Sequence, residues 1–481
     1  MERAEFLRKL GFGSLMVAAG QSLISCMHGM DMNVVPSQLD EGQFLNKLPV
    51  PETIYSGSEL LAQNAISKLD AIKESNVLGY HAGILGPTIR VRSQDLFSLK
   101  FRNGLSEKTN IHWHGLLTPD TMDGGPDLRI NANAEFEYNF KINQGTGTNW
   151  YHPHIHQNTA RQVVNGLAGL FIVESDLENQ LNLPHGDFEI PIVIQDKLIS
   201  SDGNIIYNPD MMQTMTGYLG DTLLVNGIKS PFIEVSQNLY RLRVLNGSNA
   251  RIYNLTLSTE STFHIIGADS SLLEIPVEVK SVLLAPGERL DLLVNFNSAS
   301  VGERIFLRSE TFSGMGDAQG SQAFNILQFK VTSGVKMEFS IPEKLLTLSN
   351  IGAETALRTF KFTMTMGSMN AMHRINGKSY NMNRIDETVK HLDTEIWEFD
   401  NSSGDEPHPM HIHGVQFKIV SRTGKQNTIQ PHERGLKDTV LVGPGEKVQV
   451  KMKFELKGKF VFHCHNLEHE DDGMMLNFQV S

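Results

Sequence analysis

The stretch from Val461 to Met475 constrains this chain more than any other, because it concentrates metal-binding side chains at strand spacing. It reads Val-Phe-His-Cys-His-Asn-Leu-Glu-His-Glu-Asp-Asp-Gly-Met-Met. The apolar residues at its start favour a β-strand, in which successive side chains point to opposite faces. His463 and His465 would then share one face while Cys464 points to the other. One strand can therefore serve two metal sites at once.

His469 and Met474 follow at a spacing that lets a short turn fold back over the Cys464 thiolate. Two imidazoles, a thiolate and a weak axial thioether are the ligand set of a blue electron-transfer copper site. The second imidazole is missing from this stretch and must come from elsewhere. His408, in the segment His-Pro-Met-His-Ile-His-Gly of residues 408–414, is the candidate.

Histidines at alternate positions recur in four places along the chain. One such pair is weak evidence for a site, whereas eight imidazoles presented in pairs suit a cluster of three coppers with open positions for oxygen. A structural zinc site takes about four ligands, fewer than these segments supply. The pairs are His112 and His114, His152 and His154, His411 and His413, and His463 and His465.

These four segments resemble the four copper-binding motifs of the multicopper oxidases, and they occur in that family's order. Further matches are the stretches at 218–227 and 245–251. The resemblance implies an enzyme that couples the one-electron oxidation of a reductant at a type 1 copper to the four-electron reduction of O2 to water at a trinuclear copper cluster. The implied cofactors are four copper ions, one of type 1, one of type 2 and two of type 3.

The resemblance also assigns the copper ligands residue by residue. The type 1 copper takes His408, Cys464, His469 and Met474, and the type 2 copper takes His112 and His411. The two type 3 coppers take His114, His152, His154, His413, His463 and His465. His156 is expected to hydrogen-bond behind the ligands, and His373 is expected to be an ordinary core or surface histidine.

Two carboxylates, Asp123 and Glu470, match positions that deliver protons to reduced oxygen in relatives. Oxygen reduction consumes protons, so a carboxylate beside the cluster has acid–base chemistry to perform. The competing interpretation of Asp123 is a turn former before two glycines. For Glu470 the competing interpretation is a solvated surface charge.

The length of 481 residues suits about three domains. Short alternating strands between Gly, Asn and Asp turns are typical of β-sandwiches. With the resemblance, they predict an all-β chain of three consecutive cupredoxin-like Greek-key β-sandwich domains at 45–175, 188–334 and 337–481. The middle domain holds no histidine pair and no cysteine, so we expect it to be architectural. The clearest strand patterns are at 86–92, 135–140, 190–194, 240–245, 290–294, 395–399 and 447–451.

The N-terminal residues 1–26 combine basic side chains with a short apolar run, which is typical of an export signal. Cys26 ends this run either as the lipidated residue of a lipoprotein box or as an incidental cysteine near an ordinary cleavage site. A flexible linker is expected at 27–44. The predicted location is the periplasm or its membrane face, and the protein is expected to be monomeric. The net charge of −12 gives no basic surface for nucleic acid.

The reductant is left open between Cu(I), as in the periplasmic cuprous oxidases of bacterial copper tolerance, and small phenols, as in laccases. Methionines at 211, 212, 215, 364, 366, 369 and 372 are soft ligands suited to Cu(I), or simply apolar packing. The chain lacks the long Met- and His-rich insertion of those cuprous oxidases, which favours an open type 1 site. A copper-binding protein without turnover is the alternative from another class.

Overall fold

The computed structural model describes residues 37–70, 72–81, 83–365 and 372–481, of which Gln38–Ser481 form one compact unit. The expected export signal, Cys26, residues 27–36 of the expected linker, Met366 and Met369 lie outside the described residues. Within the described ranges, no helix is both long enough and apolar enough to cross a membrane.

The first sandwich packs one sheet, in the order β4-β3-β6-β8, on a second in the order β2-β5-β10-β9-β7. Its core is rich in aromatic side chains, with Phe97, Trp113 and Phe171 fully buried and in edge contact. Strand β6 alternates buried and exposed side chains, as period-two patterning requires for a strand with one solvated face. The strands are β2 Thr53–Ile54, β3 Ser58–Lys68, β4 Glu74–Tyr80, β5 Thr88–Arg92, β6 Leu96–Asn103, β7 His112–His114, β8 Glu135–Lys141, β9 Gly147–His152 and β10 Gly169–Glu174.

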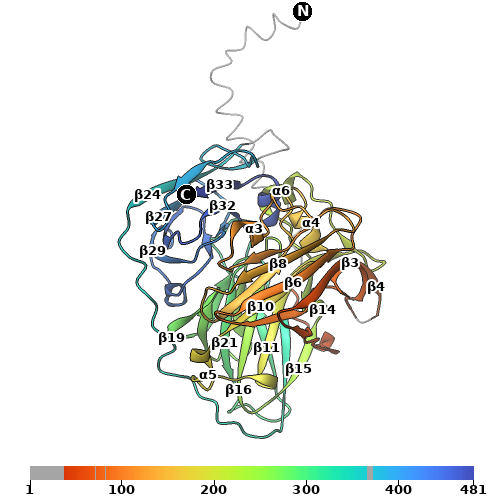
Figure 1. Ribbon diagram of the computed structural model, residues 1–481. Coiled ribbons are helices and arrows are strands. Elements are labelled where there is room, and N and C mark those ends of the chain that lie inside the picture. The colour runs from red at the N-terminus through yellow and green to blue at the C-terminus, as the bar shows by residue number, and fades with distance from the viewer. Residues whose placement is uncertain (1–36, 71, 82, 366–371) are drawn as a thin grey trace, which may run out of the picture. The chain divides into compact units, whose positions relative to one another are not determined.

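The third sandwich, coloured cyan to blue in Figure 1, contains two sheets whose strands pair as those of the first do. Its sheets run β25-β24-β27-β31-β29 and β26-β33-β32-β28-β30. Strands β3 and β6 pair in parallel as β24 and β27 do, and β7 and β9 pair antiparallel as β28 and β32 do. The strands are β24 Ala356–Met364, β25 His373–Ile375, β26 Glu387–Val389, β27 Thr394–Asp400, β28 His408–Ile412, β29 Phe417–Gly424, β30 Thr439–Val442, β31 Glu446–Lys453, β32 Gly458–Cys464 and β33 Met475–Val480.

This repetition places the histidine pairs at equivalent positions in the two outer sandwiches. His112 on β7 lies opposite His152 on β9, and His411 on β28 lies opposite His463 on β32. Since side chains directly opposite on one face lie close together, each sandwich presents its histidines as one group.

The middle sandwich has sheets in the orders β1-β15-β23-β22-β17-β20 and β14-β13-β11-β16-β21-β18-β19, with β12 beside β11. Its core is largely aliphatic. The strands are β1 Asn46–Lys47, β11 Glu189–Ile199, β12 Ile205–Ile206, β13 Thr222–Val225, β14 Ile228–Lys229, β15 Pro231–Ser236, β16 Leu239–Asn246, β17 Tyr253–Leu257, β18 Phe263–Ala268, β19 Ser271–Val279, β20 Ser281–Leu284, β21 Arg289–Asn295, β22 Arg304–Ser309 and β23 Phe324–Thr332.

Short helices join the sandwiches, and α7 is the most important of them. Its acids reach different neighbours: Glu468 accepts from Tyr218 N of the middle sandwich at 2.9 Å, and Asp471 accepts from Ala160 N at the start of α4 at 2.9 Å. A carboxylate at a helix N-terminus satisfies unpaired N–H groups. The helices are α3 Asp120–Asp123, α4 Thr159–Val164, α5 Asp176–Asn179, α6 Met211–Thr216 and α7 Leu467–Asp471, with 3-10 turns η1 Glu41–Gln43, η2 Gly186–Phe188 and η3 Pro431–Arg434.

The predicted all-β fold is confirmed, and each strand pattern named above coincides with an observed strand to within a few residues. The expectation of a flexible linker is wrong for its described end. Gln38 pairs with Phe324, and Phe44 is buried against Phe306. Apolar burial of this kind holds a segment in place, so this part of the chain belongs to the middle sandwich.

Candidate metal centres

The first group of histidines lies where the two outer sandwiches meet and combines His154, His413 and His463. The Nε2 atom of His463 lies 3.2 Å from Nε2 of His154 and 3.1 Å from Nε2 of His413. All three rings are fully or almost fully buried. Three imidazole nitrogens that converge at such distances leave room for one metal ion between them.

The second group combines His114, His152 and His465. Nδ1 of His114, Nε2 of His152 and both ring nitrogens of His465 are buried without a hydrogen-bond partner. Buried polar atoms without a partner are costly and rare in native proteins. A bound metal ion would satisfy these nitrogens.

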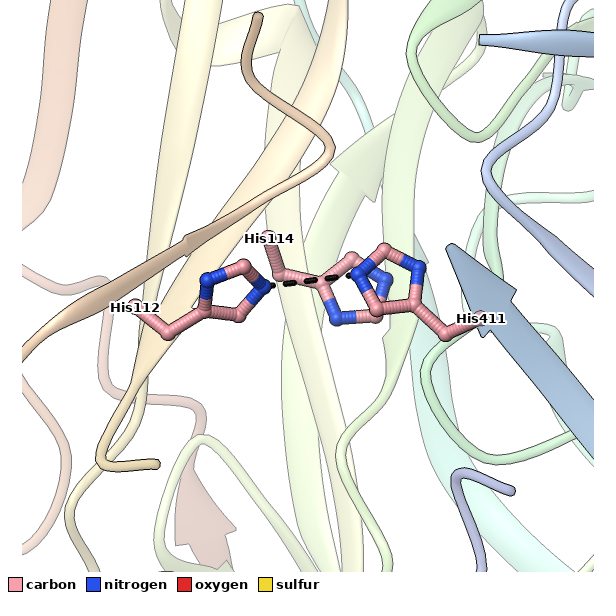
Figure 2. A group of neighbouring side chains, drawn as sticks. All are labelled: His112, His114 and His411. Atoms are coloured by element: carbon pink, nitrogen blue, oxygen red, sulfur yellow. Dashed lines mark hydrogen bonds between the residues drawn. The ribbon is translucent and has the colours of Figure 1, made fainter. Parts of the chain in front are cut away.

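His112 and His411 face each other between these groups (Figure 2), with their Nε2 atoms 3.4 Å apart. His112 comes from β7 of the first sandwich and His411 from β28 of the third. His114 stacks on the His411 ring at a centroid separation of 3.7 Å. The pair therefore bridges the domains beside both groups of three.

The chemistry of these residues fits copper. Imidazole nitrogens bind such ions at about 2 Å, which agrees with nitrogen separations of 3.1 to 3.4 Å between ligand pairs. Burial lowers the pKa of several of these histidines well below the ordinary value, and their imidazole neighbours lower it further, so they are neutral and ready to bind a metal. The residues so affected are His114, His152, His154, His411, His413 and His465.

A separate group lies on the other face of β32, around the side chain of Cys464. Its Sγ atom is 3.5 Å from Nδ1 of His408 and 3.6 Å from Nδ1 of His469. Those two nitrogens are 3.3 Å apart. Met474 is fully buried in the same apolar cluster, and its carbonyl accepts from Cys464 N at 3.0 Å, which folds the turn back over the thiol. Burial raises the pKa of the Cys464 thiol, so a bound metal is needed to hold the thiolate.

Two aspartates orient ligands of both outer sandwiches in an equivalent way. The carbonyl of Asp123 accepts from Nδ1 of His112 at 2.9 Å, and that of Asp438 accepts from Nδ1 of His411 at 2.8 Å. Each carboxylate bonds to a histidine of the opposite sandwich: Asp123 accepts from His413 at 2.7 Å, and Asp438 accepts from His114 at 2.9 Å. Such bonds fix which ring nitrogen is free for a metal.

Glu470 lies on the remaining side of the cluster, and Asp123 lies at the edge of a pocket. The Glu470 carboxylate is buried without a hydrogen-bond partner, 3.2 Å from Nδ1 of His463 and 3.5 Å from Nδ1 of His154. The pocket at Asp123 has a volume of about 340 Å³ and is also lined by Asp120 and Lys459. Neither acid is a solvated surface charge.

The structure thus brings together every histidine assigned from sequence, along with Cys464 and Met474. His156 stands apart from these groups, against the Tyr380 ring at a centroid separation of 4.8 Å. Sequence reasoning missed Asp438, whose signal was an acid directly before the apolar strand β30. It also missed His373, which stacks on His469 at 3.7 Å and carries no local signal.

Family models described as multicopper oxidase match residues 62–178, 189–336 and 356–481. The chain is 35% identical over 456 residues to multicopper oxidase mco of Staphylococcus haemolyticus, covering 92% of this chain and 94% of that protein. It is 31% identical to a laccase of Bacillus subtilis, with 91% and 98% covered. It is also 34% identical to the cell division protein FtsP of Escherichia coli, with 89% and 91% covered.

A solved structure agrees with these relatives. The McoA multicopper oxidase of the hyperthermophile Aquifex aeolicus superposes with a TM-score of 0.83 at 33% identity, covering 91% of this chain and 99% of that one. The fold, the buried histidine groups and the sequence similarity over nearly the whole length point to one conclusion. The chain belongs to the multicopper oxidase family and is a copper-dependent oxidoreductase that uses O2 as its electron acceptor.

Proposed function

We propose that the protein oxidises a small reductant at a type 1 copper and reduces O2 to water at a trinuclear cluster, with four coppers in all. The type 1 ligands are His408, Cys464, His469 and Met474. The observation that carries this proposal is that three consecutive residues, His463, Cys464 and His465, place their side chains in three separate ligand groups. The type 2 ligands are His112 and His411, and the two groups of three histidines hold the type 3 pair.

Copper bound at these residues would supply one-electron redox chemistry and the binding of oxygen. The chain supplies the connections between the sites. The peptide bonds from Cys464 to His463 and to His465 form a short covalent route for electrons from one site to the other. All these ligands are buried, which keeps bulk water away from both sites.

Asp123 and Glu470 would supply protons from opposite sides of the cluster. Asp123 can take protons from solvent through its pocket, and its carboxylate accepts a hydrogen bond from Nδ1–H of His413. Glu470 lies beside His154 and His463 with both oxygens free to hold or pass a proton. Positioned acids of this kind contribute about 10²- to 10⁴-fold to a rate.

Asp123→Asn and Glu470→Gln should each lower turnover by about 100-fold while the absorption of the type 1 copper stays intact, since both substitutions keep the shape of the side chain and remove its ability to exchange a proton. Oxygen uptake and the visible spectrum measure the two effects. Asp202→Asn, a substitution of the same kind at an exposed position, is the matched control. Turnover at the wild-type rate in both variants would show that neither Asp123 nor Glu470 delivers protons to the cluster.

We propose that Cu(I) is the reductant and that the protein serves in copper tolerance. Small phenols are the alternative reductant. Two methionines favour Cu(I): Met211 of α6 is 56% exposed and Met364 at the end of β24 is 42% exposed. Helix α6 packs on α7, which carries His469, and Met364 pairs with His373 between β24 and β25. The laccase of B. subtilis is a relative that supports the phenol alternative.

Oxygen uptake by the copper-loaded protein distinguishes these reductants. Cu(I) and a dimethoxyphenol are offered separately, the phenol without added copper. Faster uptake with Cu(I), lowered by Met211→Leu together with Met364→Leu, is the expected result. Comparable or faster uptake with the phenol would make the protein a laccase, and no uptake with either would leave a copper-binding protein without turnover.

The similarity to FtsP raises a structural role in cell division as a function of another class. The complete set of buried copper ligands argues against it, because a purely structural protein has no need of them.

We also propose that the protein is exported as a monomer and is soluble in the periplasm or held at its membrane through lipidated Cys26. Fractionation of cells that express Cys26→Ala, with sizing of the purified protein, tests this.

A further inference from the structure

His373 occupies a position at the type 1 site that the ligand assignment leaves unexplained. It begins β25 at the edge of its sheet, and only 2% of it is exposed. Its ring stacks on that of His469 at a centroid separation of 3.7 Å and an interplanar angle of 27°. It also meets the ring of His408 edge-on at 5.5 Å and 71°. His373 therefore touches both imidazoles of the type 1 site.

The two stacked rings share one hydrogen-bond acceptor. The carbonyl of Met215, in α6 of the middle sandwich, lies 3.0 Å from Nε2 of His373 and 2.9 Å from Nε2 of His469. A carbonyl oxygen has two lone pairs and can accept from both. With Nε2 of His469 donating to this carbonyl, Nδ1 is left free, and it is Nδ1 that faces Cys464 and His408.

The backbone of His373 is itself held in place. The carboxylate of Asp472, directly after α7, accepts from the N–H of His373 at 3.3 Å and from the N–H of Met372 at 2.5 Å. The stacked ring is thus tied through Asp472 to the helix that carries His469. This arrangement lets the two rings keep a fixed separation.

We propose that His373 is a positioning residue that fixes the ring plane of His469 and raises the reduction potential of the type 1 copper. This inference rests on the proposed function. Two physical effects carry it. The ring shields one face of His469 from water, and a dry surrounding favours the reduced ion of lower charge. The N–H of His373 also competes for the Met215 carbonyl, which weakens the hydrogen bond from His469 to that carbonyl. Since that hydrogen bond makes His469 a stronger electron donor and so favours the oxidised metal, its weakening favours the reduced metal.

The test compares His373→Phe and His373→Ala in the copper-loaded protein. Removal of an outer partner of a metal ligand typically costs 10- to 100-fold in metal affinity or activity. His373→Ala should shift the electron-transfer equilibrium with a reference couple toward oxidised copper by about tenfold. This shift corresponds to a fall of about 59 mV in the reduction potential of the type 1 copper. His373→Phe keeps the stack and loses only the N–H, so its potential should fall by less. Redox titration of the visible absorption measures both, and electron paramagnetic resonance reports the ligand geometry.

His185→Ala is the matched control, because the ring of His185 packs on Phe339 and belongs to none of the histidine groups. Its potential should equal that of the wild type. Unchanged potentials and resonance spectra in both His373 variants would overturn the inference and leave the type 1 site intact. Should His373→Ala not fold, His373→Phe decides by the same criterion. A fully copper-loaded wild type without blue absorption would overturn the proposed function, and this inference with it.

Discussion

Cys464→Ser is expected to abolish both the blue absorption and the uptake of oxygen. The blue colour requires a thiolate ligand, and Sγ of Cys464 is the sulfur that lies within 3.6 Å of both His408 and His469. A serine hydroxyl fits the same volume but stays protonated, so neither the absorption nor the electron route through residue 464 survives. The variant should fold, because the change of volume in the buried site is small.

Visible absorption and oxygen uptake with Cu(I) test this, alongside a count of bound copper. The ten histidines of the two sites are unchanged in the variant, so it should retain copper at the trinuclear cluster. Met474→Leu is the matched control: a thioether is a weak axial ligand, so the colour should persist while the reduction potential shifts. Blue absorption in Cys464→Ser would show that the thiolate belongs elsewhere.

The sequence predicted which histidines come together around Cys464 and between the outer sandwiches, because their pattern is local. An alternating pair of histidines on a strand must share a face, whatever the rest of the chain does. The opposite orientation of Cys464 follows from the same rule and is what separates the two sites. Strand β32 and the turn closed by Met474 could therefore be predicted without knowing how the domains pack.

The surroundings of the sites were not predictable in this way. Asp438, Arg289 and His373 have no periodic pattern, and each acts across an interface between sandwiches. Glu468 and Asp471 look like surface charges in sequence, yet Glu468 is buried, Asp471 is half-buried, and each bonds to another domain. Burial of a polar residue depends on contacts between distant segments, and those contacts exist only in the folded chain. The middle sandwich was expected to be architectural, and its Arg289 bonds to both outer sandwiches.

Arg289→Ala is expected to destabilise the protein by about 3 to 5 kcal/mol and to lower copper loading at the type 3 group of His114. Arg289 begins β21 and is fully buried. It donates to Thr148 O of the first sandwich at 2.9 Å and to Asp438 of the third at 2.8 Å. Although burial raises the pKa of Asp438, Arg289 holds it below its ordinary value, so the aspartate stays charged and can orient His114. Without the guanidinium, a buried carboxylate would remain uncompensated.

Urea unfolding of the apoprotein measures the loss of stability, and copper analysis measures the loading. Arg308→Ala is the matched control, because Arg308 pairs with the exposed Glu41 and such surface pairs contribute about 0 to 1 kcal/mol. The double variant with Asp438→Asn should recover part of the lost stability, since it removes the unpaired charge, but should not recover the type 3 copper. If Arg289→Ala matched the wild type in both measurements, the middle sandwich would contribute only contact area to the cluster. A loss in both would mean that its charge sets the orientation of a ligand on another domain.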